Sequence, residues 1–287
     1  MDLRRVTTDK KGRLPNAVII GAMRSGTSSI AHYLGKHPMI FMAPQKEVHF
    51  FDRNFSKGLL WYEEQFAMAG SERVICEATQ TYMYEQLALR RLAEFLPEAR
   101  LIAILRNPVD RAYSHYWLNR AQGKEILGFS EAIEAEPARL ASGDSQDRMT
   151  YSYVDRGKYL IQLESVCSYF PRDALKVVLF DDLLDDPEGT YRVLCDFLEV
   201  DSHLLPSEVG RVVNSFRMFR SLRTWQLAKR LPPRMRRAVG RFNAREEPYP
   251  AMDHATRERL CREYEVENRA LSEWLGRDLS PWAREVT

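Results

Sequence analysis

The sequence predicts an α/β protein with a central, mostly parallel sheet flanked by helices. Three observations support this prediction. Short apolar runs alternate with longer segments of helical periodicity, which is the order expected of a parallel sheet covered on both faces. The first apolar run ends in a glycine-containing loop that leads directly into a helical pattern. A hydrophobic fraction of 45% over 287 residues is also enough for a sizeable buried core.

The expected elements follow one another in a regular order, set by apolar periodicity and by glycine or proline breaks. The segments expected to be strands are residues 16–22, 73–79, 100–108 and 174–184. The segments expected to be helices are residues 27–38, 85–99, 109–122, 159–171, 187–200 and 255–276. Pro97 stops the second helix, and Gly276 stands in the usual stop position of the last one.

The pattern predicts a single domain over residues 1–287, with a core of about 16–205 plus 250–282 and a basic excursion over about 211–249. Between Phe216 and Ala244 there are nine Arg or Lys residues and no acidic residue. A solvated helix face is the simplest interpretation of this stretch. Binding to a polyanionic chain, or peripheral contact with an anionic membrane, is the alternative.

Composition excludes several classes of protein. A net charge of +2 is too small to indicate a nucleic-acid-binding protein, and there is no apolar run of transmembrane length. Residues 1–16 are charged without a following apolar stretch, unlike a secretory signal. The four cysteines lie far apart without a C-x-x-C pair, which argues against a zinc site or a disulfide framework. We expect a reduced, cytoplasmic protein, and the sequence does not predict its oligomeric state.

The loop after the first strand has the spacing of a phosphate-binding loop. In AVIIGAMRSGTSSIAHYL, Gly21, Gly26 and Ser28 match G-x-x-x-x-G-K-[ST], but Thr27 replaces the lysine. A strand that leads through such a loop into a helix presents backbone N–H groups and the positive helix end to an anion.

Side chains of this loop add further donors and a positive charge. Arg24 supplies the charge, and Gly26 allows close approach of the backbone. The hydroxyl donors are Ser25, Thr27, Ser28 and Ser29. An ordinary helix cap is the alternative, although it would need fewer polar residues.

Magnesium-ATP is one candidate for the anion. A nucleotide kinase would use an acid at a strand end to help hold the metal, and Asp181 is available for that role. Thr27 cannot supply the charge of the missing lysine, however. A ligand rich in negative charge and handled without a metal fits the loop better.

Three motifs resemble the sulfotransferases that use 3′-phosphoadenosine 5′-phosphosulfate (PAPS), and within them the heparan-sulfate and bacterial carbohydrate-type branch. They are GAMRSGTSS, LIAILRNPVDRAYSHYW and PQKEVHFFD followed by GLLWYEEQF. The resemblance implies a P-loop-like sulfotransferase fold and an enzyme of the EC 2.8.2 type. It implies PAPS as donor, adenosine 3′,5′-bisphosphate (PAP) as product, and no required metal. The acceptor would be a hydroxyl or amine of a carbohydrate, a glycolipid or a natural product.

The resemblance also assigns roles to individual residues. Arg24 would stabilise charge on the departing phosphate oxygen, because an arginine remains protonated throughout. Arg106 at a strand end and Ser114 eight residues later would bind the ribose 3′-phosphate. An ion pair on the surface is the alternative for Arg106.

Two residues compete for the role of general base. The resemblance favours Glu47, whose alternative is a pair with Lys46 or a turn cap. His49 would share the face of Glu47 if the segment is extended, and histidine is the commoner base near neutral pH. His49 therefore stays a rival, and could instead align the substrate.

The sequence departs from the family pattern in two places. Ala78 stands where much of the family has a lysine, leaving the acceptor cleft to be lined by Glu77, Thr79 and Tyr82. The glycine- and lysine-rich loop before Tyr249 is also absent. Residues of the basic stretch that would bind the donor instead are Asn214, Arg217 and Arg220. A non-catalytic anion-binding module is the remaining alternative, although Glu47 and His49 argue against it.

Overall fold

The computed structural model describes residues 13–211 and 249–283, and scattered residues between these ranges at 218–219, 224, 227–228, 231–232, 235, 239 and 244–245. The chain divides into two compact units. The first comprises Met1–Arg106 and Leu160–Val213, and the second comprises Asn107–Tyr159 and Asn214–Thr287.

The first unit is built on a five-stranded sheet in the order β2-β3-β1-β4-β5. All neighbouring strands run parallel, with Ala17 of β1 opposite both Cys76 and Arg100. The strands are β1 (Ala17–Gly21), β2 (Ile40–Met42), β3 (Val74–Ala78), β4 (Arg100–Leu105) and β5 (Leu175–Leu179). Because parallel strands end at one edge, the segments that follow β1, β3 and β4 meet there.

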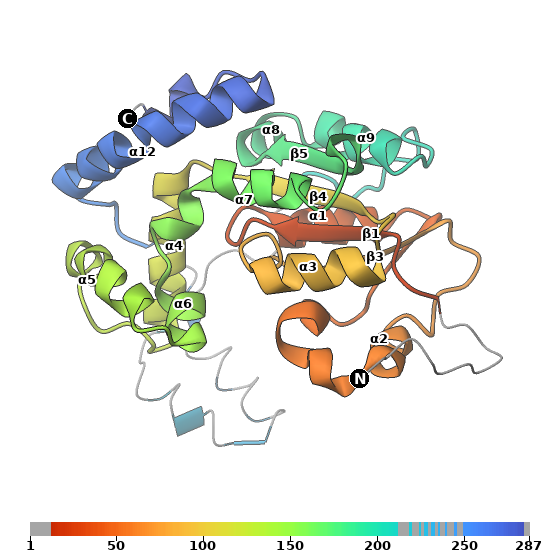
Figure 1. The fold of residues 1–287 in the computed structure, drawn as a ribbon, viewed down its shortest axis with the longest axis horizontal. Helices are drawn as coiled ribbons and strands as arrows, with labels where there is room; N and C mark the ends of the chain where they lie inside the picture. The colour runs from red at the N-terminus through yellow and green to blue at the C-terminus, as the bar shows by residue number, and fades with distance from the viewer. Residues whose placement is uncertain are drawn as a thin grey trace. The chain divides into compact units, whose positions relative to one another are not determined.

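Helices cover both faces of this sheet (Figure 1). On one face, α1 (Thr27–Leu34) and α9 (Pro187–Phe197) bury Ile30 and Leu194 against the strands. On the other, α3 (Gln86–Phe95) and α7 (Tyr159–Cys167) lie in front of the sheet in Figure 1. The unit also contains α2 (Leu59–Glu64), α8 (Phe180–Asp185) and the short turns η1 (Phe50–Asn54), η2 (Phe55–Lys57) and η4 (Arg172–Ala174).

The second unit is mainly helical and has a core rich in aromatic side chains. Tyr113, Tyr116 and Phe129 pack with Leu260 and Tyr264 in a buried cluster. Its elements are α4 (Pro108–Ala121), α5 (Phe129–Ala141), α6 (Ser145–Tyr151), η3 (Asp155–Gly157), α12 (His254–Leu275), η5 (Ser280–Ala283) and the antiparallel pair β6 (Met218–Phe219) and β7 (Ala244–Arg245).

Local signals in the sequence account for the ends of the two long helices of the second unit. The side chain of Asn107 accepts from the N–H of Val109 at the start of α4, which has Pro108 as its first residue. The side chain of Asp253 accepts from the N–H of Thr256 at the start of α12. That helix ends at Gly276 in the left-handed conformation, as expected from the sequence.

The predicted fold class is confirmed, with several corrections to individual elements. The strand β2 was not expected, because a three-residue strand leaves no periodicity to detect. The strand expected over 174–184 ends at Leu179, since the chain turns into α8 at Phe180. Asp181 therefore lies in the first turn of a helix, which weakens its match to the strand-end acid of a kinase. The helix expected over 159–171 ends at Cys167.

The basic stretch predicted between Phe216 and Ala244 falls largely outside the described residues, as do Asn214, Arg217 and Arg220. In the part of the chain that the structure describes, no helix combines the length and the apolar content needed to cross a membrane.

Candidate active site

The loop between β1 and α1, residues 22–26, lies at the carboxyl edge of the sheet and is called the donor loop here. Gly26 has a φ of 89°, and a Cβ on it would come within 2.9 Å of the Phe180 ring. Only glycine combines this left-handed backbone with such close packing. The sequence thus places a glycine where the chain must turn tightly into α1.

The hydroxyl of Ser25 is a candidate donor to an anion bound at the donor loop. The N-cap residue of α1 is Gly26, which has no side chain, so the helix-cap alternative does not account for the hydroxyls around it. Ser25 is fully buried, and its Oγ has no hydrogen-bond partner within the described residues. A buried hydroxyl without a partner is costly unless a ligand or water satisfies it. Ser28 and Ser29 are half-buried on the first turn of the helix.

Arg106 lies directly against the donor loop. Its Nη1 donates to the carbonyl oxygen of Arg24 at 3.3 Å, and its guanidinium lies 4.8 Å from the centre of the Phe180 ring. Arg106 is half-buried in this position. Ser114 belongs to the second unit, where it is buried on α4 with 2% of its surface exposed.

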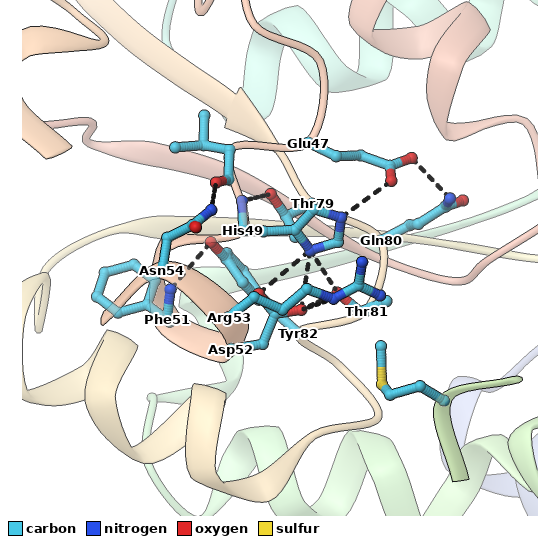
Figure 2. Close-up of polar contacts among 12 residues, drawn as sticks. Glu47, His49, Phe51, Asp52, Arg53, Asn54, Thr79, Gln80, Thr81 and Tyr82 are labelled. Carbon is cyan, nitrogen blue, oxygen red and sulfur yellow. Dashed lines mark hydrogen bonds and ion pairs between the residues drawn. The ribbon is translucent and has the colours of Figure 1, made fainter. Parts of the chain in front are cut away.

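A second group of polar residues surrounds Glu47 (Figure 2). His49 lies between two carboxylates: its Nε2 is 3.2 Å from Glu47 Oε2 and its Nδ1 is 2.9 Å from Asp52 Oδ2. Both Glu47 and His49 have positive φ, 56° and 54°, so this segment is a turn and not the extended backbone on which the two residues would share a face. Their side chains meet because the chain curls between them. Among the described residues, the Glu47 carboxylate contacts His49 and Gln80, and the predicted alternative of a pair with Lys46 is not found.

Residues of the turn after β3 complete this cluster. Gln80 Nε2 donates to Glu47 Oε1 at 2.7 Å, and Thr81 Oγ1 donates to Asp52 Oδ2 at 2.7 Å. The backbone N–H of His49 donates to Thr79 Oγ1 at 3.3 Å. The Glu47 carboxylate is therefore held on two sides, while 25% of its side chain remains exposed to a substrate.

The electrostatics of the cluster keep His49 charged. Burial lowers the pKa of His49, but hydrogen bonds to the Asp52 and Glu47 carboxylates outweigh burial and raise the pKa to about 9. Burial also acts to raise the pKa of Asp52, and the hydrogen bond from His49 more than offsets it, so that pKa is lowered. At neutral pH, His49 is an imidazolium that donates to both neighbours.

Glu77 and its neighbours do not line a cleft as expected from the sequence. Glu77, Thr79 and Tyr82 have no exposed surface. Tyr62 donates to Glu77 Oε1 at 2.6 Å and Thr79 donates to Oε2 at 2.8 Å, beneath the cluster around Glu47. Burial raises the pKa of Glu77 to about 7. These buried residues support the cluster around Glu47 and do not line a cleft.

Comparison with known proteins agrees with this geometry. A sequence profile of the sulfotransferase domain family matches residues 14–261. The chain belongs to the sulfotransferase family. Members of this family use PAPS as donor, so the predicted resemblance and enzyme class are confirmed at the level of the family.

Individual relatives of this sulfotransferase are glycan-modifying enzymes by name. The bifunctional heparan sulfate N-deacetylase/N-sulfotransferase 2 of Bos taurus is 28% identical over 95% of this chain, and the chain spans 31% of that relative. The heparan sulfate glucosamine 3-O-sulfotransferase 6 of Mus musculus is 28% identical over 93% of this chain and 73% of its own length. The chain thus spans less than a third of the first of these relatives.

A solved structure has the same architecture. The sulfotransferase from Alicyclobacillus acidocaldarius is 26% identical and covers 95% of this chain and 100% of its own, with a TM-score of 0.74. This likeness supports the assignment of the sulfotransferase fold.

Three polar residues of the sulfotransferase site were missed by sequence reasoning: Asp52, Gln80 and Thr81. Asp52 follows His49 by three residues, a spacing that allows contact if the chain turns, so the signal was present. Gln80 and Thr81 come from another segment, and no local pattern connects them with Glu47. Within the described residues, no group of three or more His, Cys, Asp or Glu is arranged to hold a metal ion.

The charge on His49 has a consequence for stability. Because its pKa is raised to about 9 in the folded state from 6.5, its contribution is complete below about pH 6.5 and is lost as the pH rises through about 9. We expect the free energy of unfolding to fall over this window in urea titrations, and His49→Gln to reduce that slope. His203→Gln, at an exposed histidine of the same unit, is the control and should leave the slope unchanged. Equal slopes in all three proteins would contradict the charged state assigned to His49.

Proposed function

We propose that this chain transfers the sulfuryl group of PAPS to a hydroxyl or amine of a carbohydrate, glycolipid or natural-product acceptor. The observation that carries the proposal is the position of Glu47. Its carboxylate is held by His49 and by Gln80, and Gln80 is in turn hydrogen-bonded to Thr27, the first residue of α1 directly after the donor loop. A candidate base and a candidate anion site are thus joined through a single side chain.

The donor loop fits the 5′-phosphosulfate of PAPS. Backbone N–H groups at the start of α1 and the unpartnered Ser25 hydroxyl would bind its oxygens, with Thr27, Ser28 and Ser29 as further donors. Arg24 supplies a positive charge at the same loop. Arg106 is proposed to bind the 3′-phosphate. The same role for Ser114, which belongs to the second unit, stays a prediction from the sequence.

In the proposed reaction, the acceptor oxygen or nitrogen forms a bond to sulfur while the bond from sulfur to the phosphate oxygen breaks. The proton of the acceptor passes to Glu47, and the negative charge left on the departing phosphate is stabilised by Arg24. His49 is an unsuitable base, since an imidazolium has no lone pair to accept a proton. We assign it instead to orienting Glu47.

The acceptor is proposed to be a glycan, because the named relatives act on heparan sulfate. A kinase is less well supported, since Asp181 lies in α8 and Thr27 supplies no charge. A non-catalytic module would have no need for the three ionisable side chains of Glu47, His49 and Asp52 assembled in one cluster. The single domain over residues 1–287 and the cytoplasmic location stay predictions.

Binding of PAP tests the donor assignment. We expect PAP to raise the melting temperature without added metal, because the proposed site holds both of its phosphates and a ligand that binds only the folded state stabilises it. Magnesium-ATP should have a much smaller effect at the same concentration. Equal or greater stabilisation by magnesium-ATP would contradict the proposal and favour a kinase. Transfer of labelled sulfate from PAPS to a panel of glycans then identifies the acceptor.

A further inference from the structure

Gln80 occupies an unusual place in the first unit, in the turn that follows β3. It is half-buried, and its carboxamide contacts both the turn that carries Glu47 and the start of α1. Its Nε2 donates to Glu47 Oε1 at 2.7 Å, and its Oε1 accepts from Thr27 Oγ1 at 3.4 Å. Figure 2 shows the amide beside the carboxylate oxygen of Glu47 that does not face His49.

The chemistry of the two neighbours fixes which end of the amide faces each of them. An ionised carboxylate can only accept hydrogen bonds, so the group facing Glu47 must be the NH₂ group. The carbonyl oxygen then faces the Thr27 hydroxyl, which can donate to it. A glutamate would offer no donor to Glu47, and an aliphatic side chain would offer neither group.

The hydrogen bond from Gln80 restrains the second oxygen of the Glu47 carboxylate. His49 donates to Oε2, and Gln80 donates to Oε1, so rotation of the carboxylate breaks at least one hydrogen bond. A carboxylate has about four lone-pair positions, so two donors leave room for the proton of an acceptor. The two donors belong to different segments: His49 lies on the same turn as Glu47, whereas Gln80 lies in the turn after β3.

We propose that Gln80 is a positioning residue that fixes the carboxylate of Glu47 relative to the donor loop by bridging to Thr27. The inference rests on the proposed function of this site. In-line transfer needs the base, the acceptor and the donor in one geometry, and a displacement of about 1 Å can cost on the order of 100-fold in rate. Gln80 itself contacts neither reacting atom in this assignment.

Gln80→Ala and Gln80→Glu test the proposal, with Gln86→Ala at the exposed start of α3 as the matched control. We expect both Gln80 variants to lower kcat by roughly 10-fold or more, with the KM for PAPS and the PAP-induced rise in melting temperature little changed. Gln80→Glu keeps the shape of the side chain but turns a donor into a second carboxylate facing Glu47. The acidic limb of its pH–rate profile should therefore move to higher pH, whereas Gln86→Ala should match the wild type.

The Glu47→Gln background shows whether Gln80 acts through Glu47. If it does, Gln80→Ala should lower kcat by less than about 2-fold in that background, because the group that it positions is already lost. An equal loss in both backgrounds would overturn the inference, as would normal kcat in both single variants. If Gln80→Ala fails to fold, the nearly isosteric Gln80→Glu carries the test. A wild-type protein that PAP does not stabilise would remove the proposed function, and this inference with it.

Discussion

Glu47→Gln should lower kcat by roughly 100-fold or more, the usual scale for the loss of a positioned general base. The amide has the size of the carboxylate, and one of its ends can still contact His49, so lost packing cannot explain a large effect. Glu47 lies outside the donor loop, so PAP should still raise the melting temperature of the variant. Sulfate transfer measured at saturating PAPS and acceptor gives the change in kcat directly.

His49→Ala is the comparison that separates the two candidate bases. Its effect on kcat should be smaller than that of Glu47→Gln, because Glu47 retains its hydrogen bond from Gln80. Near-normal turnover in Glu47→Gln together with a collapse in His49→Ala would transfer the role of base to His49. Loss of PAP binding in either variant would instead indicate that this cluster belongs to the donor site.

Arg106→Ala should weaken PAP binding by about 2 to 4 kcal/mol, on the order of 30- to 1000-fold in Kd. The guanidinium is half-buried against Phe180 and donates to the donor loop, so its charge lies where a phosphate would need it. Calorimetric titration of PAP into wild type and variant measures the difference.

Arg90→Ala is the matched control, since it removes an exposed arginine from α3 in the same unit. Its Kd for PAP should stay within about 2-fold of the wild type. If Arg106→Ala also left the Kd for PAP unchanged, Arg106 would not bind the donor and its role would be structural. Arg106→Lys should recover only part of the binding, because lysine keeps the charge but cannot bind a phosphate in a bidentate way.

The sheet and the donor loop were predictable from the sequence because their signals are local. Apolar runs mark β1, β3 and β4, glycine marks the end of β1, and asparagine and proline mark the end of β4. The left-handed Gly26 and the position of Arg106 after β4 follow from the same pattern. The strand β2 was missed because three residues are too few for a periodicity.

The cluster around Glu47 was only partly predictable. Glu47 and His49 were expected to share a face of an extended segment, and their side chains do meet, but through a turn in which both residues have positive φ. A backbone conformation that is uncommon for residues other than glycine cannot be inferred from residue type. Gln80 and Thr81 reach the cluster through tertiary packing, about thirty residues further along the chain, where no spacing rule applies.

The position of His49 between Glu47 and Asp52 also determines the summed charge of these three side chains. With both carboxylates ionised and the imidazolium between them, these three side chains carry one negative charge in total. If Glu47 takes up the proton of the acceptor, the charge of these three side chains falls to zero as the anionic sulfuryl group arrives, which removes their net repulsion of the product while it forms. When the proton leaves for solvent, the negative charge returns and opposes the bound sulfate ester. Protonation of Glu47 would thereby favour the transfer, and its later ionisation would favour the release of product.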